Sequence, residues 1–123
     1  MEVRSYRDLI VWQKSMQLVT EIYLLTKDFP KEEIYGLTSQ IKRAVISVPS
    51  NIAEGQGRDS TKEFIHHLSI AYGSLMEVET QLQIAVNLNF VEQTKINEMY
   101  SRTAEISRMI NGLSRSLQNK LKV

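Results

Sequence analysis

The chain has 123 residues, a formal net charge of +1 and 42% hydrophobic residues, a size and composition typical of a single domain over residues 1–123. It contains no cysteine, which excludes disulfides, thiolate catalysis and cysteine-ligated metal. The near-neutral charge excludes a general attraction to nucleic acid, so such binding would need a local patch. Because no apolar run is long enough for a membrane span or a signal peptide, we expect a cytoplasmic protein.

The first predicted helix runs from about Asp8 to Lys27, and Ser5 with Asp8 three residues later has the spacing of a capping box. Its apolar residues form two adjacent stripes that together cover close to half of the circumference. A helix with one partner needs only one stripe, so we expect this helix to make more than one contact. One stripe contains Leu9, Trp12, Met16, Val19 and Tyr23, and the other contains Val11, Leu18, Ile22 and Leu25.

The second predicted helix covers Lys31 to about Glu54 and follows Pro30, which suits the first position of a helical turn. Gly36 is expected to loosen its first turns. The end of the helix is expected at Gly55-Gln56-Gly57, because glycine accepts the left-handed conformation that is common just past a helix.

A proline lies inside the second helix, among the positions of its apolar face. Pro49 removes a backbone hydrogen bond and crowds the carbonyl four residues back, which costs about 3 kcal/mol in a helix interior. We therefore expect a kink near Pro49 that suits a particular neighbour. Asn51 and Glu54 are interpreted as partners for the backbone groups that the proline leaves open, with ligand binding as the alternative.

The third helix is predicted to begin at Ser60-Thr61-Lys62-Glu63, a second capping box, and the fourth after Asn89-Phe90-Val91-Glu92, a tight turn with a third box. Both helices have apolar residues at alternating spacings of three and four, which predicts one buried face for each. The predicted core residues are Phe64, Leu68, Ala71, Leu75, Val78, Leu82 and Ala85 in the third helix, and Ile96, Met99, Thr103, Ile106, Ile110, Leu113 and Leu117 in the fourth.

Short connections join the four helical segments, and no run of alternating β-branched residues predicts a strand. Short connections favour antiparallel neighbours. The sequence therefore predicts an all-α fold, an antiparallel up-down-up-down four-helix bundle whose second helix is kinked near Pro49.

Three stretches resemble a known protein family: YRDLIVWQKSM (Tyr6 to Met16), FPKEEIYGLTSQIKRAVISVPSNIAEG (Phe29 to Gly55) and STKEFIHHLSIAYGSLMEVETQL (Ser60 to Leu82). They are similar to the four-helix bundle proteins encoded in intervening sequences of bacterial 23S rRNA genes, and to the related accessory variability proteins of diversity-generating retroelements. The most specific signatures include Gly36, Pro49, Asn51, Glu54 and Gly55.

The resemblance implies a four-helix protomer that assembles into a homopentamer with a central channel. For the retroelement relatives it also implies a basic surface that binds nucleic acid. It implies no enzyme activity.

Apolar residues outside the predicted core favour self-association independently of the resemblance. Ile10 and Leu24 lie outside the main arc of the first helix, and Ile70, Ile84 and Leu88 lie toward the back of the third. Scattered surface hydrophobes are the alternative explanation. Spacing does not determine the number of copies, so a pentamer is expected from the resemblance alone.

One E-x-x-H motif, from Glu63 to His66, has the spacing that di-iron four-helix proteins use. Such a site needs a second motif and two further glutamates, and His66 is expected to point away from the core. His67 is interpreted as a surface partner of Glu63. No serine or threonine has a plausible base and orienting acid, so we expect no enzyme, no metal site and no cofactor.

Basic residues are the remaining functional candidates, for contacts with the phosphates of RNA. Two lie on the polar side of the second helix, two flank the turn into the third, and three recur every seven residues on the fourth. A ring of subunits would multiply the last group into a basic belt, although a solvated helix face is the alternative. The candidates are Lys42, Arg43, Arg58, Lys62, Arg108, Arg115 and Lys122.

Three functions are compatible with these features. The first is a homo-oligomeric accessory protein that binds RNA or a ribonucleoprotein with little sequence preference, because no aromatic residue lies among the cations. The second is a protein–protein interaction scaffold without nucleic acid. The third, an enzyme or metal carrier, has the least support.

Overall fold

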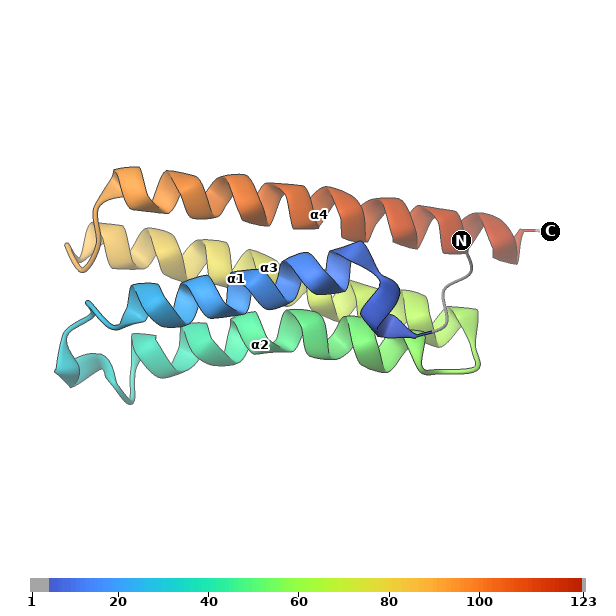
Figure 1. The fold of residues 1–123 in the computed structure, drawn as a ribbon, viewed down its shortest axis with the longest axis horizontal. Coiled ribbons are helices and arrows are strands. Elements are labelled where there is room, and N and C mark those ends of the chain that lie inside the picture. Colours follow the sequence, from blue (N-terminus) through green and yellow to red (C-terminus); the bar gives the residue numbers. More distant parts are fainter. Residues whose placement is uncertain (1–4, 123) are drawn as a thin grey trace.

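The computed structural model describes residues 5–122, and within that range it contains helices and no strand. Four long helices lie side by side (Figure 1). The prediction of an all-α fold with four helices is thereby confirmed. The helices are α1 (Ile10–Thr26), α2 (Leu37–Gln56), α3 (Thr61–Asn87) and α4 (Gln93–Leu121), and two short 3-10 turns, η1 (Tyr6–Asp8) and η2 (Lys31–Glu33), precede α1 and α2.

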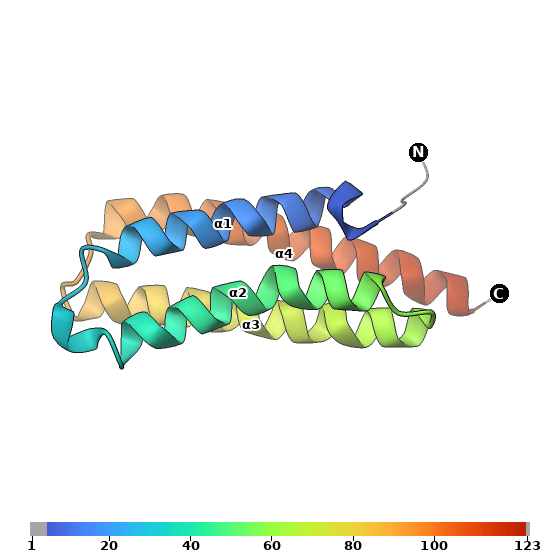
Figure 2. The ribbon, with the colours of Figure 1, turned by 60° about the horizontal axis from the view of Figure 1, so that its bottom comes forward.

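Consecutive helices run in opposite directions, so the α1–α2 and α3–α4 connections lie at one end of the molecule and the α2–α3 connection lies at the other (Figure 1, Figure 2). α2 packs against α1 and α3, and α4 packs against α3 and α1. Within residues 5–122, no Cα atom of α2 lies within 8 Å of a Cα atom of α4, which places the two helices diagonally across the bundle. Surfaces on these two helices are therefore separate.

The core contains residues from all four helices, and these include the apolar faces predicted for α3 and α4. Every predicted core residue of these two helices is buried except Phe64 and Leu113, which are half-buried. α1 contributes the stripe that contains Leu18 and Ile22, whereas its other stripe lies at the edge of the core, where Met16 is 43% exposed. The two stripes predicted for this helix therefore form a buried face and a partly exposed one.

The chain enters α1 through η1, whose start is capped. Ser5 Oγ accepts a hydrogen bond from the Arg7 N–H at 3.1 Å, and Asp8 Oδ2 accepts one from the Ser5 N–H at 3.2 Å, which confirms the first capping box. The box caps η1 rather than α1, because Leu9 has an extended backbone with a ψ of 122°. The predicted helix start near Asp8 is corrected to Ile10.

The start of α2 also differs from the prediction. The residues from Lys31 form η2 as a separate turn, and α2 begins only at Leu37, whose N–H donates to Glu33 Oε1 at 3.0 Å. Gly36 lies at the N-cap, where a Cβ would be 2.9 Å from Glu33 Oε1. Gly36 therefore marks a complete break before the helix rather than a loosened turn within it.

α2 ends at Gln56, as predicted from Gly55-Gln56-Gly57, but two other details expected at the helix ends are wrong. Gly57 follows α2 with a φ of −76°, in the right-handed region, so no left-handed glycine ends this helix. Ser60 Oγ accepts from the Glu63 N–H at 3.2 Å, as expected of the second capping box. The third box does not form, because Glu92 is the N-cap of α4 and makes no side-chain capping bond. The turn before it depends on Asn89, whose φ of 63° is left-handed.

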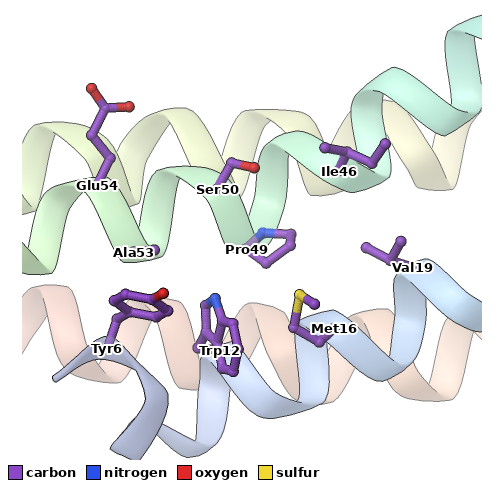
Figure 3. Close-up of a pocket in the computed structure, with 9 residues that line it drawn as sticks. All are labelled: Tyr6, Trp12, Met16, Val19, Ile46, Pro49, Ser50, Ala53 and Glu54. Carbon is purple, nitrogen blue, oxygen red and sulfur yellow. The ribbon is translucent and has the colours of Figure 1, made fainter.

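α2 continues across Pro49 as one helix. Since proline has no N–H, the carbonyl of Val45, four residues earlier, loses its helical partner. Pro49 is buried and its ring faces α1 (Figure 3). The bend predicted at this position stays a prediction.

Candidate protein and nucleic-acid interfaces

An open groove of about 530 Å³ lies between α1 and α2 (Figure 3). One wall is the partly exposed stripe of α1, and the other is a flank of α2 that includes the proline and small side chains. η1 contributes one aromatic ring, because the extended residue before α1 turns the chain back along the helix. The groove is lined by Tyr6, Trp12, Met16, Val19, Ile46, Pro49, Ser50, Ala53 and Glu54.

Aromatic side chains form the end of the groove nearest the N-terminus. The ring centroids of Tyr6 and Trp12 are 5.1 Å apart with an interplanar angle of 66°, an edge-to-face contact. The Arg7 guanidinium carbon lies 5.4 Å from the Tyr6 centroid and 6.0 Å from the Trp12 centroid, within cation–π range. This rim therefore combines apolar surface with an exposed cation.

Among the described residues, Glu54 is the acidic side chain that lines the groove. Its Oε1 accepts a hydrogen bond from Arg58 Nη2 at 2.8 Å, and both side chains are about half exposed. Exposed pairs of this kind contribute about 1 kcal/mol or less, because water screens them. Glu54 therefore pairs with the side chain of Arg58, one turn further along the chain. The sequence had suggested instead that it bonds the backbone groups around Pro49.

The opposite flank of α2 closes against α3 through a row of polar contacts, which we call the α2–α3 seam. Ser74 Oγ donates to Ser47 Oγ at 2.8 Å, and the Asn51 amide donates to the Ser47 carbonyl at 2.9 Å and its hydroxyl at 3.0 Å. Asn51 Oδ1 lies 3.0 Å from His67 Nδ1. Since an amide oxygen only accepts, this assignment of the amide requires the proton on Nδ1.

Two interpretations of the sequence change at this seam. Asn51 bonds the carbonyl of Ser47, whereas Pro49 frees the carbonyl of Val45, so Asn51 does not compensate for the proline. His67 bonds Asn51 on the neighbouring helix. The prediction that His67 forms a surface pair within α3 is therefore wrong.

Gly55 sets the distance between α2 and α3 at one end of the seam. A Cβ at this position would lie 2.7 Å from the Cβ of His67 and 3.0 Å from a ring carbon of Phe64. Only glycine fits so close an approach without movement of the helices. Gly55 is thus explained by packing and not by a left-handed backbone.

The basic candidates on α2 and in the turn after it have different surroundings. Lys42 Nζ lies 4.7 Å from the ring centroid of Tyr23, a cation–π contact, and Arg58 is already ion-paired. Arg43 and Lys62 are exposed. At about 1.5 Å per residue, Lys42 and Arg58 are about 24 Å apart along the helix direction. These four cations therefore do not form one patch.

The three candidates on α4 form a separate row. Arg108, Arg115 and Lys122 are exposed, and none of them joins an ion pair within residues 5–122. The row is about 21 Å long by the helical rise. A hollow of about 420 Å³ at one end is lined by Arg108 together with Glu98 and Glu105, so that end has mixed charge.

Other large apolar side chains are exposed outside the groove. Tyr35, in the connection between η2 and α2, is 94% exposed, and its neighbour Ile34 is 58% exposed. The residues that the sequence placed outside the main arcs are exposed as expected; they are Ile10, Leu24, Ile70, Ile84 and Leu88.

The part of the chain that the structure describes contains no group of three or more side chains that could hold a metal ion. His66 is exposed, and its ring contacts the ring of His67 at a centroid distance of 5.9 Å. Among the helices of residues 5–122, none is both long and apolar enough to cross a membrane.

Comparison with known proteins identifies a family and several solved structures of similar fold. The family model described as 23S rRNA-intervening sequence protein matches residues 7–112. No curated protein matches the sequence significantly. A solved structure from Bacteroides thetaiotaomicron VPI-5482, described as a protein with unknown function from the S23 ribosomal protein family, has a TM-score of 0.80 at 23% identity and covers 86% of this chain and 96% of its own. This similarity shows a shared fold.

Proposed function

This chain belongs to the family of 23S rRNA-intervening sequence proteins, and we propose that it is a non-enzymatic homo-oligomer, a pentamer, that binds RNA through exposed cations. The apolar groove between α1 and α2 is the observation that supports the oligomer most directly. The row of cations on α4 supports RNA binding.

Self-association is supported by apolar surface that the protomer leaves in water. Met16 is 43% exposed and Ile46 is 41% exposed on the two sides of the groove. Burial of such surface against another protein surface is favourable, at about 25 cal/mol per Å². The pentameric number rests on the resemblance of the sequence to the four-helix proteins described above.

RNA binding is supported by Arg108, Arg115 and Lys122, which have no carboxylate partner within residues 5–122. Unpaired cations can contact phosphates, and a ring repeats the same row around its axis. Each contact releases counterions from the RNA, so binding is expected to weaken steeply with salt.

A protein–protein scaffold without nucleic acid is the second candidate. The groove favours it, because among the described residues no lysine or arginine lines it. Such walls suit the apolar surface of a protein and not a phosphate backbone.

The mass of the native purified protein tests the assembly. The protomer has a mass of 14.2 kDa, and we expect a species of pentameric mass. The ultraviolet absorbance ratio of the same sample reports whether nucleic acid co-purifies. A species of protomer mass at all concentrations would contradict the proposal, and a stoichiometric protein partner without RNA would favour the scaffold.

A salt titration of binding to a structured RNA tests the cations. Replacement of Arg108 and Arg115 by Gln should weaken binding and reduce the slope of log K against log salt by about 0.7–0.9 for each phosphate that the variant no longer neutralises. Replacement of the exposed Lys27 and Lys95 by Gln removes the same charge and should leave binding unchanged. Equal losses of affinity in the two double variants, or an affinity that does not depend on salt, would contradict RNA binding by this row.

A further inference from the structure

We propose that the groove between α1 and α2 binds the Ile34–Tyr35 turn of a second copy of this chain. The inference rests on the proposed homo-oligomer and names the contact that holds it together. Tyr35 is 94% exposed, more than any other large apolar side chain in residues 5–122. An exposed tyrosine offers a large contact area and few rotatable bonds, and interface anchors are enriched in this residue.

The turn that presents Tyr35 is held in one shape by its own hydrogen bonds. The Glu33 N–H donates to the Pro30 carbonyl at 3.0 Å, and the Gly36 N–H donates to the Glu33 carbonyl at 2.9 Å. The Leu37 N–H donates to Glu33 Oε1 at 3.0 Å. Because the backbone on both sides of Tyr35 is already ordered, docking requires little further loss of conformational entropy.

The groove has the size and chemistry for such an anchor. Its volume of about 530 Å³ can hold an aromatic ring with an aliphatic neighbour, and it opens to solvent along its length. Figure 3 shows Tyr6, Trp12 and Met16 along α1 and η1, facing Pro49 and Ala53 of α2 across the gap. A further aromatic ring can pack edge to face against the first two.

The charges around the two surfaces are complementary. The turn is flanked by Lys31 and Glu32, both exposed, and the rim of the groove has the exposed Arg7 and Glu54. Glu32 of one copy can therefore meet Arg7 of the next while Tyr35 enters the groove, and Lys31 can approach Glu54, whose Oε1 also accepts a hydrogen bond from Arg58. Such pairs fix orientation more than affinity.

The occupant has to come from another copy. Pro49 and Ala53 lie about 18 and 24 Å beyond Leu37 along α2, and the turn lies at the end of the bundle (Figure 2). The side chain of Tyr35 does not span that distance within one protomer. Because the turn and the groove are different surfaces, the contact is head-to-tail and closes into a ring when the rotation between copies allows it.

Single cysteines test the contact directly, because the chain has none of its own. Protein with Ile34→Cys, which keeps Tyr35 and replaces a neighbour that is 58% exposed, is mixed with protein with Ala53→Cys under mild oxidation, and mass spectrometry of the linked peptides is expected to find the joined 34–53 pair. A mixture of Leu88→Cys with Ala53→Cys is the control, since Leu88 is a 53% exposed apolar residue on α3. Equal yields of the two mixed pairs would overturn the proposal.

Assembly measured by sedimentation gives a second readout. Tyr35→Ala and Glu32→Arg should each raise the concentration for half-assembly by about tenfold or more, and Arg7→Glu should restore assembly of the Glu32→Arg protein. All three side chains are exposed, so the protomer should keep its fold. If the natural sequence assembles and these variants assemble equally well, this contact is wrong while the proposed oligomer stands. If the natural sequence stays at 14.2 kDa, both are wrong.

Discussion

α2 meets its two neighbours in different ways. The α2–α3 seam is closed. Ser74 of α3 donates a hydrogen bond to Ser47, Asn51 Oδ1 accepts one from His67 of α3, and Gly55 lies where the helices come close together. The groove toward α1 is open and apolar, although α2 presents small side chains such as Ser50 and Ala53 there too. Small residues on one helix are therefore not sufficient for close packing.

The partner helix accounts for the difference. α3 places Ser74 and His67 opposite the small residues of α2, where hydrogen bonds join the helices. α1 places Trp12 and Met16 opposite the other flank, and these long side chains separate the backbones without filling the space. One flank of α2 is thus closed by hydrogen bonds within the protomer, whereas the other keeps apolar side chains exposed to solvent.

Gly55→Ala should have the largest effect, because it forces the closed seam apart. The new Cβ would lie 2.7 Å from the His67 Cβ, and overpacking of this kind costs about 1–3 kcal/mol, partly offset by a gain in helix propensity of about 1 kcal/mol. We expect a net loss of up to about 2 kcal/mol in the free energy of unfolding, measured in urea at fixed protein concentration.

Gly73→Ala is the matched control for this change. No heavy atom lies within 4 Å of a Cβ added at Gly73, which is also inside a helix. The protein should therefore gain up to about 1 kcal/mol from helix propensity alone. A gain of the same size in both variants would show that the close approach at Gly55 is not a constraint.

Pro49→Ala, on the open flank of α2, should raise the free energy of unfolding, because it removes a proline from the interior of the helix. The helix gains about 3 kcal/mol from removal of the proline, and loss of two buried methylenes costs about 1.6 kcal/mol. We expect the free energy of unfolding to rise by about 1.4 kcal/mol, measured in the same way. A rise of this size would show that Pro49 contributes to the shape of the groove and not to the stability of the protomer.

Pro30→Ala is the control for the proline. Pro30 lies before η2 with a φ of −57°, a conformation that proline favours, so its replacement should lower stability by about 0.4–1 kcal/mol. If Pro49→Ala also lowers stability, the proline ring stabilises the α1–α2 contact by more than it costs α2.

The fold was predictable because its signals are local. The repeat of apolar residues in α3 and α4 specifies which side chains are buried, and the buried residues match. The starts of α1 and α2 were less predictable, because the 3-10 turns η1 and η2 have the same short-range pattern as the first turn of an α-helix. The extended backbone of Leu9 could not be predicted, because a single extended residue does not alter the spacing of the apolar residues around it.

The candidate sites depend on contacts between distant residues, which explains what the sequence missed. The second stripe of α1 indicated an additional contact surface, but the packing of Tyr6 on Trp12 requires the turn at Leu9. The contact of Asn51 with His67 joins residues 16 apart on different helices, and no spacing rule indicates it. The sequence assigned the cations to three separate segments, but only the structure shows that Arg58 is ion-paired and that Lys42 lies on the ring of Tyr23.

The contact between Asn51 and His67 should give the smallest effect, and it tests whether the polar seam stabilises the protomer. A double-mutant cycle with Asn51→Ala and His67→Ala should give a coupling free energy of about 0.5–1.5 kcal/mol, because the hydrogen bond between them is partly buried. The control cycle replaces Gln93 and Asn97, whose 3.1 Å bond on the surface of α4 should couple by only about 0.2–0.5 kcal/mol. A coupling at the seam no larger than the control would mean that these polar contacts are a consequence of the close approach at Gly55 and not a cause of it.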